Sequence, residues 1–308
     1  MSRVLVTGGA GFIGSNLVRA LLERGDDVRV LDNFSTGNRA NLDGLDVEIV
    51  EGELRSYERV HNAVRRAEVV YHLGALGSVP RSVQDPLTSS AVNIEGTLNV
   101  LLAARDEGVR RVVFSSSTSV YGSSAQRPTT ETMPPDPISP YGVAKLAAER
   151  YCISCSRVYE SFESVVLRYF NVFGPRQSPL SQYAAVVPLF VTAIAAGEPI
   201  DVHGDGEQSR DFTYVDNVVD ATIRAGETAG ASGEIFNIAA GAPASVNTLA
   251  NMIGAILGRP VERRHLPPRP GDIRNSWADL SKAEQILGYR PQVGLEDGLR
   301  RTIEFLGV

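Results

Sequence analysis

The chain has few cysteines and few lysines for its 308 residues: Cys152 and Cys155, Lys145 and Lys282. Two cysteines cannot build a disulfide framework or complete a four-ligand zinc site, so no metal site is expected. Both lie inside a helical pattern with no strand before it, which favours packing residues over a redox pair. The remaining 28 of the 30 basic residues are arginine, as a coding preference would produce. A lysine that is retained against this preference is of interest, although an accident of counting is the alternative.

The chain also lacks a basic excess and a long apolar run. Its 36 acidic and 30 basic residues give a formal net charge of −6, which argues against a surface for nucleic acid or anionic membranes. The longest apolar stretch, residues 184–196, is interrupted by Pro188 and Thr192 and is too short to span a bilayer. Met1 and Ser2 lead directly into the strand-like residues 3–6, without the pattern of a signal peptide. We therefore expect a soluble, cytoplasmic protein that binds neither nucleic acid nor membrane.

The order of apolar patterns indicates the fold class. Apolar and charged residues make up 43% and 21% of the chain, as in ordinary folded proteins, and the length suits one large domain or two modest ones. Strands are expected at residues 4–6, 28–31, 47–50, 69–73, 112–115 and 165–168. Helices are expected at residues 12–23, 57–66, 94–107 and 141–161. This alternation predicts an α/β fold, a Rossmann-type, doubly wound parallel sheet.

The pattern changes after about Phe173, where prolines break the chain into shorter pieces. We expect the sheet domain over residues 1–173 and a smaller, mixed α/β cap domain over residues 174–308. A segment at about 210–240, with a strand pattern at 234–239, is expected to return to the main sheet.

A glycine-rich loop follows the first expected strand and opens the first expected helix. Gly9, Gly11 and Gly14 satisfy G-x-G-x-x-G, and Gly8, Gly11 and Gly14 satisfy the variant G-x-x-G-x-x-G. Small residues there let the backbone approach a pyrophosphate, whose charge lies at the helix N-terminus. By itself the loop also suits a plain strand–turn–helix.

Asp32 supplies the context that the glycine loop needs. It ends the second expected strand, where a carboxylate accepts hydrogen bonds from an adenosine ribose. The same charge repels the 2′-phosphate of NADP, and no arginine stands directly beside it in the sequence. The combination favours NAD over NADP as the cofactor.

Tyr141 and Lys145 form Tyr-x-x-x-Lys at the start of a helix announced by Ser139 and Pro140. The spacing places phenol and ammonium on one helix face, where the cation is expected to lower the pKa of the phenol towards neutrality and create a general base. Alone, this pair is a frequent surface accident. However, Ser117 lies at the end of an expected strand, and such ends line the ligand crevice of an open α/β sheet.

With these residues in this order, the chain strongly resembles the extended short-chain dehydrogenase/reductase family, the NAD-dependent nucleotide-sugar epimerases and dehydratases, over essentially its whole length. The resemblance implies that Ser117, Tyr141 and Lys145 are catalytic, that NAD binds the sheet domain and a UDP-sugar the cap, and that Asn93 supports the active-site helix. The residues implied in cofactor binding are Gly8, Gly11, Phe12, Ile13, Gly14, Asp32, Asn33, Glu53, Leu54, Leu73, Ala75, Tyr141, Lys145 and Tyr169. Those implied in substrate binding are Ser78, Ser117, Ser119, Asn171, Arg176, Val187, Arg210, Arg269, Asp272 and Ser276. The chain departs from the family pattern at Glu53, usually an aspartate near adenine, and at Gly74, usually alanine.

The resemblance also gives individual roles to residues of the cap. Tyr169 is expected near the nicotinamide and Asn171 on the sugar diphosphate. Arg210 and Arg269 look like the diphosphate clamps, because two guanidinium groups can offset a diphosphate through paired hydrogen bonds. Asp272 would hold the uridine ribose. As lone arginines in loops, Arg210 and Arg269 would otherwise be read as surface residues.

Family membership does not choose a reaction, so the residues around the expected site must. The resembling 4,6-dehydratases carry an Asp-Glu pair directly after the catalytic hydroxyl, and the UDP-glucuronate decarboxylases carry a Glu at the second position. Here these positions are Thr118 and Ser119, so elimination and decarboxylation lose support. C4 epimerisation remains: Tyr141 takes the 4-hydroxyl proton, C4 gives a hydride to tightly bound NAD, and the 4-keto sugar turns before the hydride returns. A lyase and a non-catalytic NAD-binding protein are the rival classes, although the latter has no need of Ser117, Tyr141 and Lys145 together.

The identity of the UDP-sugar rests on three short segments. Residues 76–82 and 183–188 look most like epimerases that act on UDP-N-acetylhexosamines. Ser276 matches the family's gate position, where a small residue admits an N-acetyl group, although UDP-glucuronate 4-epimerases also have a small residue there. Arg81 and Arg176 are candidate partners for a sugar carboxylate. A substrate of the UDP-GlcNAc/UDP-Glc type is therefore expected, with UDP-glucuronate as the alternative.

The resemblance further implies a homodimer. Its interface would pack the helices near residues 94–107 and 141–161 as a four-helix arrangement. The pattern of Leu98, Leu101 and Leu102 is equally compatible with the core of one chain.

Overall fold

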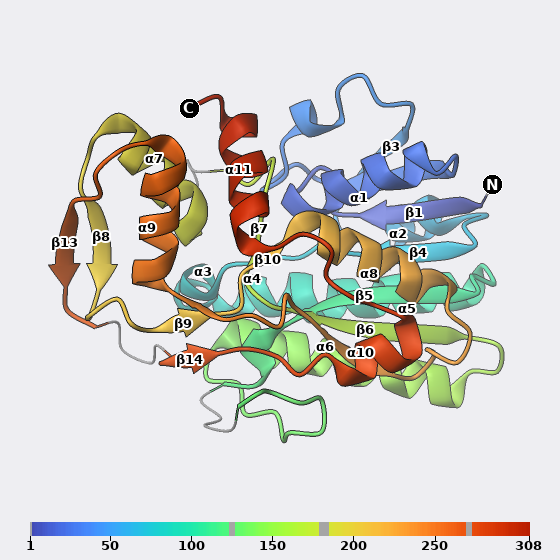
Figure 1. The fold of residues 1–308 in the computed structure, drawn as a ribbon. Coiled ribbons are helices and arrows are strands. Elements are labelled where there is room, and N and C mark those ends of the chain that lie inside the picture. Colours follow the sequence, from blue (N-terminus) through green and yellow to red (C-terminus); the bar gives the residue numbers. More distant parts are fainter. Residues whose placement is uncertain (1, 123–126, 179–184, 269–272) are drawn as a thin grey trace.

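A seven-stranded sheet forms the centre of the protein (Figure 1). The structure, a computed structural model, describes residues 2–122, 127–178, 185–268 and 273–308. The strand order is β11-β6-β5-β4-β1-β2-β3, and every neighbouring pair is parallel. The strands are β1 (Arg3–Thr7), β2 (Asp27–Asp32), β3 (Glu48–Glu51), β4 (Val69–His72), β5 (Arg111–Ser117), β6 (Glu163–Tyr169) and β11 (Ile235–Ile238). The predicted Rossmann-type fold class is confirmed.

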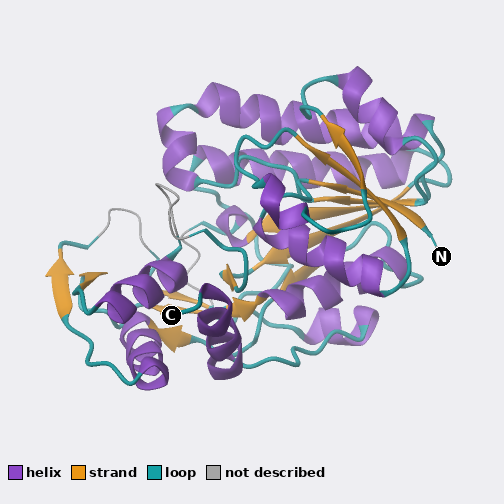
Figure 2. Cartoon of the chain, turned by 90° about the horizontal axis from the view of Figure 1, so that it is seen from above, coloured by secondary structure: helices purple, strands orange, loops and turns teal. Residues whose placement is uncertain are grey.

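Helices cover both faces of the sheet, as the view along it shows (Figure 2). One face carries α1 (Phe12–Glu23) and α8 (Val215–Glu227). The other face carries α2 (Tyr57–Val64), α5 (Gly96–Asp106) and α6 (Pro140–Val158). Each helix buries an apolar stripe against the strands, which is the arrangement that parallel strands with two apolar faces require.

The strands divide their side chains between two hydrophobic clusters. In β1, Val4 and Val6 face the α1/α8 side, whereas Leu5 faces the α2/α5/α6 side. Val69 and Tyr71 in β4 are separated from Val70 in the same way. Successive side chains of a strand point to opposite faces, so runs of β-branched and aromatic residues can fill both layers.

Short helical pieces follow the carboxyl ends of several strands. They are the 3-10 turns η1 (Arg39–Leu42) and η3 (Thr118–Val120), the helices α3 (Val79–Gln84) and α4 (Pro86–Ser90), and a π-helical turn, η2 (Ala91–Glu95), which leads into α5. The helix expected at residues 94–107 therefore continues an already helical segment.

A smaller part of the chain lies beyond the carboxyl ends of the strands (Figure 1). Its helices are α7 (Val186–Ala196), α9 (Val246–Leu257) and α11 (Leu295–Leu306). Its strand pairs are β7 (Val172–Phe173) with β10 (Thr213–Tyr214), β8 (Ile200–His203) with β13 (Arg263–Leu266), and β9 (Ser209–Arg210) between β12 (Ala244–Ser245) and β14 (Asn275–Ser276). The helix α10 (Ser281–Leu287) packs beside β11.

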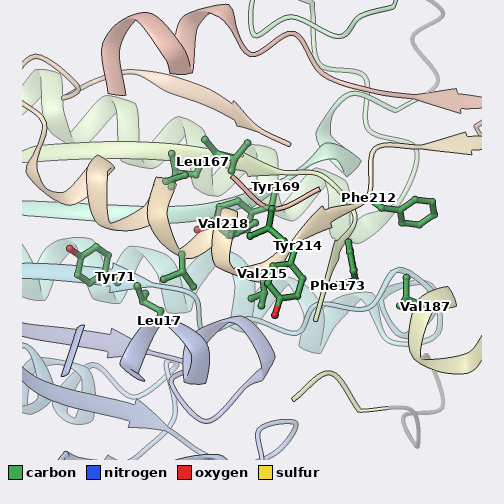
Figure 3. Packing of buried hydrophobic residues seen from close by; sticks show 14 of the residues in the cluster. Leu17, Tyr71, Leu167, Tyr169, Phe173, Val187, Phe212, Tyr214, Val215 and Val218 are labelled. Carbon is green, nitrogen blue, oxygen red and sulfur yellow. The ribbon is translucent and has the colours of Figure 1, made fainter. Parts of the chain in front are cut away.

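One hydrophobic cluster connects this smaller part with the sheet. Figure 3 shows it running from Leu17 and Tyr71 through Tyr169 to Phe212 and Val187. α8 and β11 belong to the main layers, although both follow residue 173 in the sequence. The strand expected at 234–239 is β11, and it pairs with β6. Within the described residues, no helix combines the length and the apolar character needed to cross a membrane.

Candidate active site

The glycine-rich loop connects β1 to the start of α1, and two of its glycines lie where the backbone leaves no room for a side chain. Gly8 has a φ of +69°, and a Cβ atom there would lie 2.7 Å from the Cα atom of Gly74. A Cβ atom on Gly14 would overlap the carbonyl oxygen of Gly8. The amide of Gly11 donates to that same carbonyl, at 3.1 Å. The loop is therefore closed tightly against the start of α1, whose free N–H groups form a site for a phosphate.

Asp32 holds this loop as well as facing the cleft. One carboxylate oxygen accepts the amide of Ala10 at 2.9 Å, and the other accepts the amide of Phe34 at 2.8 Å. The side chain lines a cavity, although the residue is only 8% exposed. The sequence gives Asp32 a role towards a ribose but does not indicate that it braces the loop. The remaining lone pairs of the carboxylate can still accept from a ligand hydroxyl.

A cavity of about 270 Å³ lies between the glycine loop and the ends of β2, β3 and β4. The expected cofactor residues that line it are Gly8, Gly11, Asp32, Asn33, Glu53, Leu54, Leu73 and Ala75. Other lining residues that sequence reasoning did not assign to the cofactor are Ser35, Thr36, Gly37, Arg55, Arg81 and Thr88. The rule that ligands lie at the carboxyl ends of strands could have indicated residues 35–37, since they follow β2 directly.

Six of the expected cofactor residues do not line this cavity: Phe12, Ile13, Gly14, Tyr141, Lys145 and Tyr169. Gly14 acts through the close packing of the loop. Tyr169 is buried, and its hydroxyl shares a hydrogen bond of 2.7 Å with Thr222 in α8. The hydroxyl is thus directed into the core, where burial raises the pKa of Tyr169.

The three expected catalytic residues come together from β5 and α6. Ser117 is the last residue of β5, and Tyr141 and Lys145 lie in the first turns of α6. The hydroxyl of Ser139 caps that helix by accepting the amide of Gly142 at 3.1 Å. A Cβ atom on Gly142 would lie 2.5 Å from the Ser119 carbonyl oxygen, so a glycine after Tyr141 lets the helix start directly against the end of β5.

The electrostatics of Tyr141 and Lys145 differ from the expectation. Burial raises the pKa of Tyr141 to about 12, and a hydrogen bond with Ser117 offsets part of that rise. Lys145 donates to the Ser115 carbonyl at 2.7 Å, and its Nζ lies 5.9 Å from the centre of the Tyr141 ring. The expectation that Lys145 by itself brings the pKa of the phenol towards neutrality is wrong, because burial dominates and the ammonium is directed to the strand. An oxidised nicotinamide bound nearby would add a positive charge that opposes this rise.

The pKa of Lys145 is lowered to about 8, chiefly by burial, and the nearby carboxylate of Glu149 opposes the shift. We therefore expect Lys145→Met to raise the free energy of unfolding at pH 7 by about 1–2 kcal/mol, because removal of a buried charge outweighs the lost hydrogen bond to Ser115. A group whose folded-state pKa lies below its usual value of 10.5 penalises folding most below that folded-state pKa. The gain should therefore shrink as the pH rises from 8 to 10.5.

Urea unfolding at several pH values measures this difference. Lys282→Met is the matched control, because Lys282 is partly exposed and pairs with Glu234 at 2.7 Å. A Lys145→Met variant that is destabilised equally at every pH would contradict the prediction.

A second cavity of about 440 Å³ opens between α7, β8 and β9. Asn171 and Arg210 line it, as the sequence leads us to expect. Asn171 has a φ of +29°, and its carbonyl accepts the amide of Thr213 at 3.2 Å. Asparagine tolerates this sparsely populated region better than most residues, so the chain can turn at the edge of the cavity. Ser276 lies close by, since it pairs with Arg210 across β14 and β9.

Other expected substrate residues lie elsewhere. Val187 is 1% exposed and packs in the core, whereas its neighbour Val186 lines the cavity. Arg176 donates to the Asn16 side chain and lies 5.5 Å from the Phe305 ring centre, which places it against α1 and α11. Neither side chain therefore takes the expected place in this cavity, because helical register and packing direct each one away.

The remaining expected residues are near the ends of β4 and β5 or cannot be placed. Ser78 caps α3 by accepting the amide of Arg81 at 3.2 Å. Ser119 accepts a hydrogen bond from the Ser117 hydroxyl at 3.1 Å. Arg269 and Asp272 lie outside the described residues.

Asn93 and Glu53 differ in detail from their expected roles. The Asn93 side chain accepts the amide of Leu76 at 2.8 Å and donates to its carbonyl at 3.2 Å. Its side chain therefore holds the segment after β4, which lines the 270 Å³ cavity, while the turn η2 that carries it packs against α6. Glu53 faces the same cavity and is paired with Arg55 at 2.6 Å.

Comparison with known proteins identifies the family. The sequence model of the NAD dependent epimerase/dehydratase family matches residues 4–239. A UDP-glucose 4-epimerase of Mycolicibacterium smegmatis is 42% identical, with 98% of each chain covered. The crystal structure of UDP-glucose 4-epimerase with UDP-glucose from Thermotoga maritima is 41% identical, with a TM-score of 0.95 over 99% of this chain and 98% of that one. A UDP-N-acetylglucosamine 4-epimerase from Methanobrevibacter ruminantium, in complex with UDP-N-acetylmuramic acid, is 38% identical, with a TM-score of 0.94 and the same coverage.

The fold and the glycine-lined cleft define a dinucleotide-binding α/β protein. The chain belongs to the NAD dependent epimerase/dehydratase family, and NAD is its cofactor. The residues present fit this group, since side chains at Gly8 and Gly14 would fill the space that the closed loop requires. NAD supplies the hydride acceptor and donor when it is bound.

Proposed function

We propose that the protein is a UDP-sugar 4-epimerase that inverts C4 through a 4-keto intermediate. The observation that carries this proposal is the group formed by Ser117, Tyr141 and Lys145, with a hydroxyl in place of an acid beside it. Ser119 accepts a hydrogen bond from Ser117, at the position where a decarboxylase or dehydratase would place a carboxylate. Without that carboxylate, transfer of the 4-hydroxyl proton to Tyr141 leads to reversible oxidation at C4 rather than to elimination.

The residues have distinct tasks in this proposal. Ser117 hydrogen-bonds the 4-hydroxyl of the sugar and Tyr141, and Tyr141 takes and later returns the proton. Lys145 supplies positive charge beneath the phenol. Arg210 holds the diphosphate through charge-assisted hydrogen bonds while the sugar turns. The protein must bind the diphosphate more tightly than the sugar, because the 4-keto sugar has to turn and present both of its faces.

We propose UDP-GlcNAc and UDP-Glc as the substrate class. The small Ser276 beside Arg210 leaves room for an N-acetyl group, and the relatives described above act on UDP-glucose or UDP-N-acetylglucosamine by name. UDP-glucuronate loses one of its two candidate partners, because Arg176 lies against Asn16 and Phe305. Arg81 lines the dinucleotide cavity and remains the possible partner of a carboxylate.

Incubation with UDP-GlcNAc, UDP-Glc and UDP-GlcA, each alone and without added NAD, tests the proposal. NMR of the products distinguishes C4 inversion from a keto-deoxy sugar or a pentose. We expect the C4 epimer of UDP-GlcNAc, UDP-Glc or both. Turnover of UDP-GlcA alone would move the assignment to the alternative substrate, and failure to form any C4 epimer would reject the reaction.

We also propose that the protein is a homodimer, with an interface built by α6, as the resemblance implies, and by α3 and α4, which pack against α6, in place of the expected helix α5. Leu101, which was considered for such an interface, is 0% exposed and belongs to the core. The exposed apolar side chains of the three packed helices are instead Val79, Val83, Leu87, Val143, Tyr151 and Val158. We expect sedimentation equilibrium to give twice the chain mass and Leu87→Glu to give a monomer. Phe305→Glu, an exposed position on α11, is the control. A wild-type monomer at micromolar concentration would contradict the proposal.

A further inference from the structure

A buried ion pair lies behind the catalytic side chains and joins α6 to β6. Glu149 is 0% and Arg168 is 1% exposed. Arg168 donates from Nε to Oε1 of Glu149 at 2.9 Å and from Nη2 to Oε2 at 2.7 Å. The Ser116 hydroxyl donates to the same Oε1 at 2.5 Å. One carboxylate thus binds residues from both β5 and β6.

The Glu149 carboxylate extends the contact between α6 and β5 that Lys145 makes one turn earlier. Tyr141, Lys145 and Glu149 follow one another at four-residue intervals and therefore share a face of α6. Lys145 binds the carbonyl of Ser115, and Glu149 binds the hydroxyl of Ser116. Two successive turns of the helix thus hold two successive residues of β5. The next residue in β5 is Ser117.

Glu149 is also the anion that faces Lys145 within the described part of the chain. Of the other titratable groups there, Tyr141 stays protonated because burial raises its pKa to about 12, and Cys152 stays a thiol because burial raises its pKa. His72, in β4, is neutral because burial lowers its pKa to about 3. Arg168, in β6, pairs with Glu149 at 2.7 Å and carries the compensating positive charge.

Stability alone does not account for such a pair. A buried ion pair commonly contributes no more than well-packed apolar residues of similar volume, because desolvation offsets the attraction between the charges. Nη1 of Arg168 makes no hydrogen bond among the described residues, and the guanidinium lies 4.6 Å from the centre of the Tyr121 ring, which replaces only part of its lost hydration. The geometry around Ser116 and Lys145 gives the pair a task that apolar residues cannot perform.

We propose that Glu149 and Arg168 form a positioning pair for the reaction: they register β5 against α6, which places Ser117 beside Tyr141, and they set the electric field at Lys145. This inference rests on the proposed function, since it takes Ser117, Tyr141 and Lys145 as the catalytic group. Neither member of the pair touches the substrate or the cofactor in this proposal.

The scarcity of lysine makes the field at Lys145 directly measurable. Protein that contains [ε-13C]lysine has two lysine signals, and Lys282→Arg assigns them. We expect the Lys145 signal of the wild type to titrate near pH 8. In Glu149→Gln, loss of the anion and the uncompensated Arg168 should lower the midpoint by roughly one pH unit. In the double variant Glu149→Gln with Arg168→Met, the midpoint should lie between these two values.

The double variant also covers the case in which Glu149→Gln does not fold, since it removes both charges of the pair and no uncompensated charge of Arg168 remains. An unchanged Lys145 midpoint in the folded double variant would overturn the electrostatic half of the proposal. Because the titration follows Lys145 without substrate, it is independent of whether the protein is an epimerase. Failure of the proposed function would appear as the absence of any C4 epimer from wild-type protein.

Ser116→Ala tests the other half, because it removes the hydrogen bond to Glu149 and keeps the charges. We expect kcat to fall about three- to ten-fold at unchanged KM, with the Lys145 midpoint unmoved. Ser116→Thr, which keeps the hydroxyl, should recover most of that loss. An Ala variant with wild-type kcat would overturn the role of the pair in placing Ser117.

Discussion

Tyr141→Phe should lower kcat for epimerisation by about 10²- to 10⁴-fold, the range that a positioned general base supplies. The substitution removes one hydroxyl from the group formed with Ser117 and leaves the ring in place. The phenol is protonated at neutral pH in both the folded and the unfolded state, so its removal takes away one hydrogen bond and no charge, and the fold should lose little stability. The expected result is a folded protein that still contains NAD and no longer transfers the proton of the 4-hydroxyl.

Product NMR with the substrate that the wild type converts gives kcat, and release of NAD on denaturation gives the bound cofactor per chain. Tyr151→Phe is the matched control, because Tyr151 lies on the same helix and is 42% exposed. It should keep wild-type turnover. If Tyr141→Phe retained full turnover, Tyr141 would not be the base and the proposed mechanism would be wrong.

Gly14→Ala should weaken the binding of NAD. Alanine is the better helix former by about 1 kcal/mol, so propensity alone would favour the variant. The new Cβ atom, however, would overlap the backbone carbonyl of Gly8, and a carbonyl held by the Gly11 amide cannot move without opening the loop. We expect NAD binding to weaken by at least about ten-fold, which needs only about 1.4 kcal/mol, and the free energy of unfolding to fall by about 1–3 kcal/mol.

Gly294→Ala separates this effect from a general response to loss of a glycine. A Cβ atom on Gly294 would meet nothing within 4 Å, and its φ of −75° suits alanine. Cofactor content, measured on the protein as purified, and the midpoint of thermal unfolding should both match the wild type in that variant. Wild-type NAD content in Gly14→Ala would show that the loop can relax, and that its close packing is not what the cofactor requires.

The architecture of the sheet could be predicted from the sequence because its signals are local and repeated. The β-branched runs that form β1, β2, β4, β5 and β6 fall within a few residues of their expected positions, since strands that are buried on both faces need continuous apolar runs. The glycine loop and the Tyr-x-x-x-Lys spacing also carry their meaning within one turn of helix.

The second half of the site could be predicted only in part. Asn171 and Arg210 line the second cavity, but Val187 and Arg176 do not. Whether Val186 or Val187 faces a cavity depends on the rotation of α7 about its axis, and a mainly apolar helix gives that rotation no clear signal. Arg176 lies beside Asn16 and Phe305, and contacts with residues so distant in the chain depend on how α1 and α11 pack.

The sequence by itself determined the order of strands and helices, the preference for NAD and the choice of Ser117, Tyr141 and Lys145 as the proposed catalytic group, because each depends on residue type and spacing within short segments. The tertiary structure decided the charges of that group. In the sequence, Tyr141 and Lys145 are a phenol beside a cation, which predicts a lowered pKa for the phenol. In the structure, burial is the main cause of the raised pKa of Tyr141 and of the lowered pKa of Lys145. The tertiary structure also decided that Glu149, an ordinary helix residue in the sequence, pairs with Arg168 behind the catalytic side chains. Desolvation and long-range packing arise only when the layers close around these side chains, so a linear pattern cannot express them.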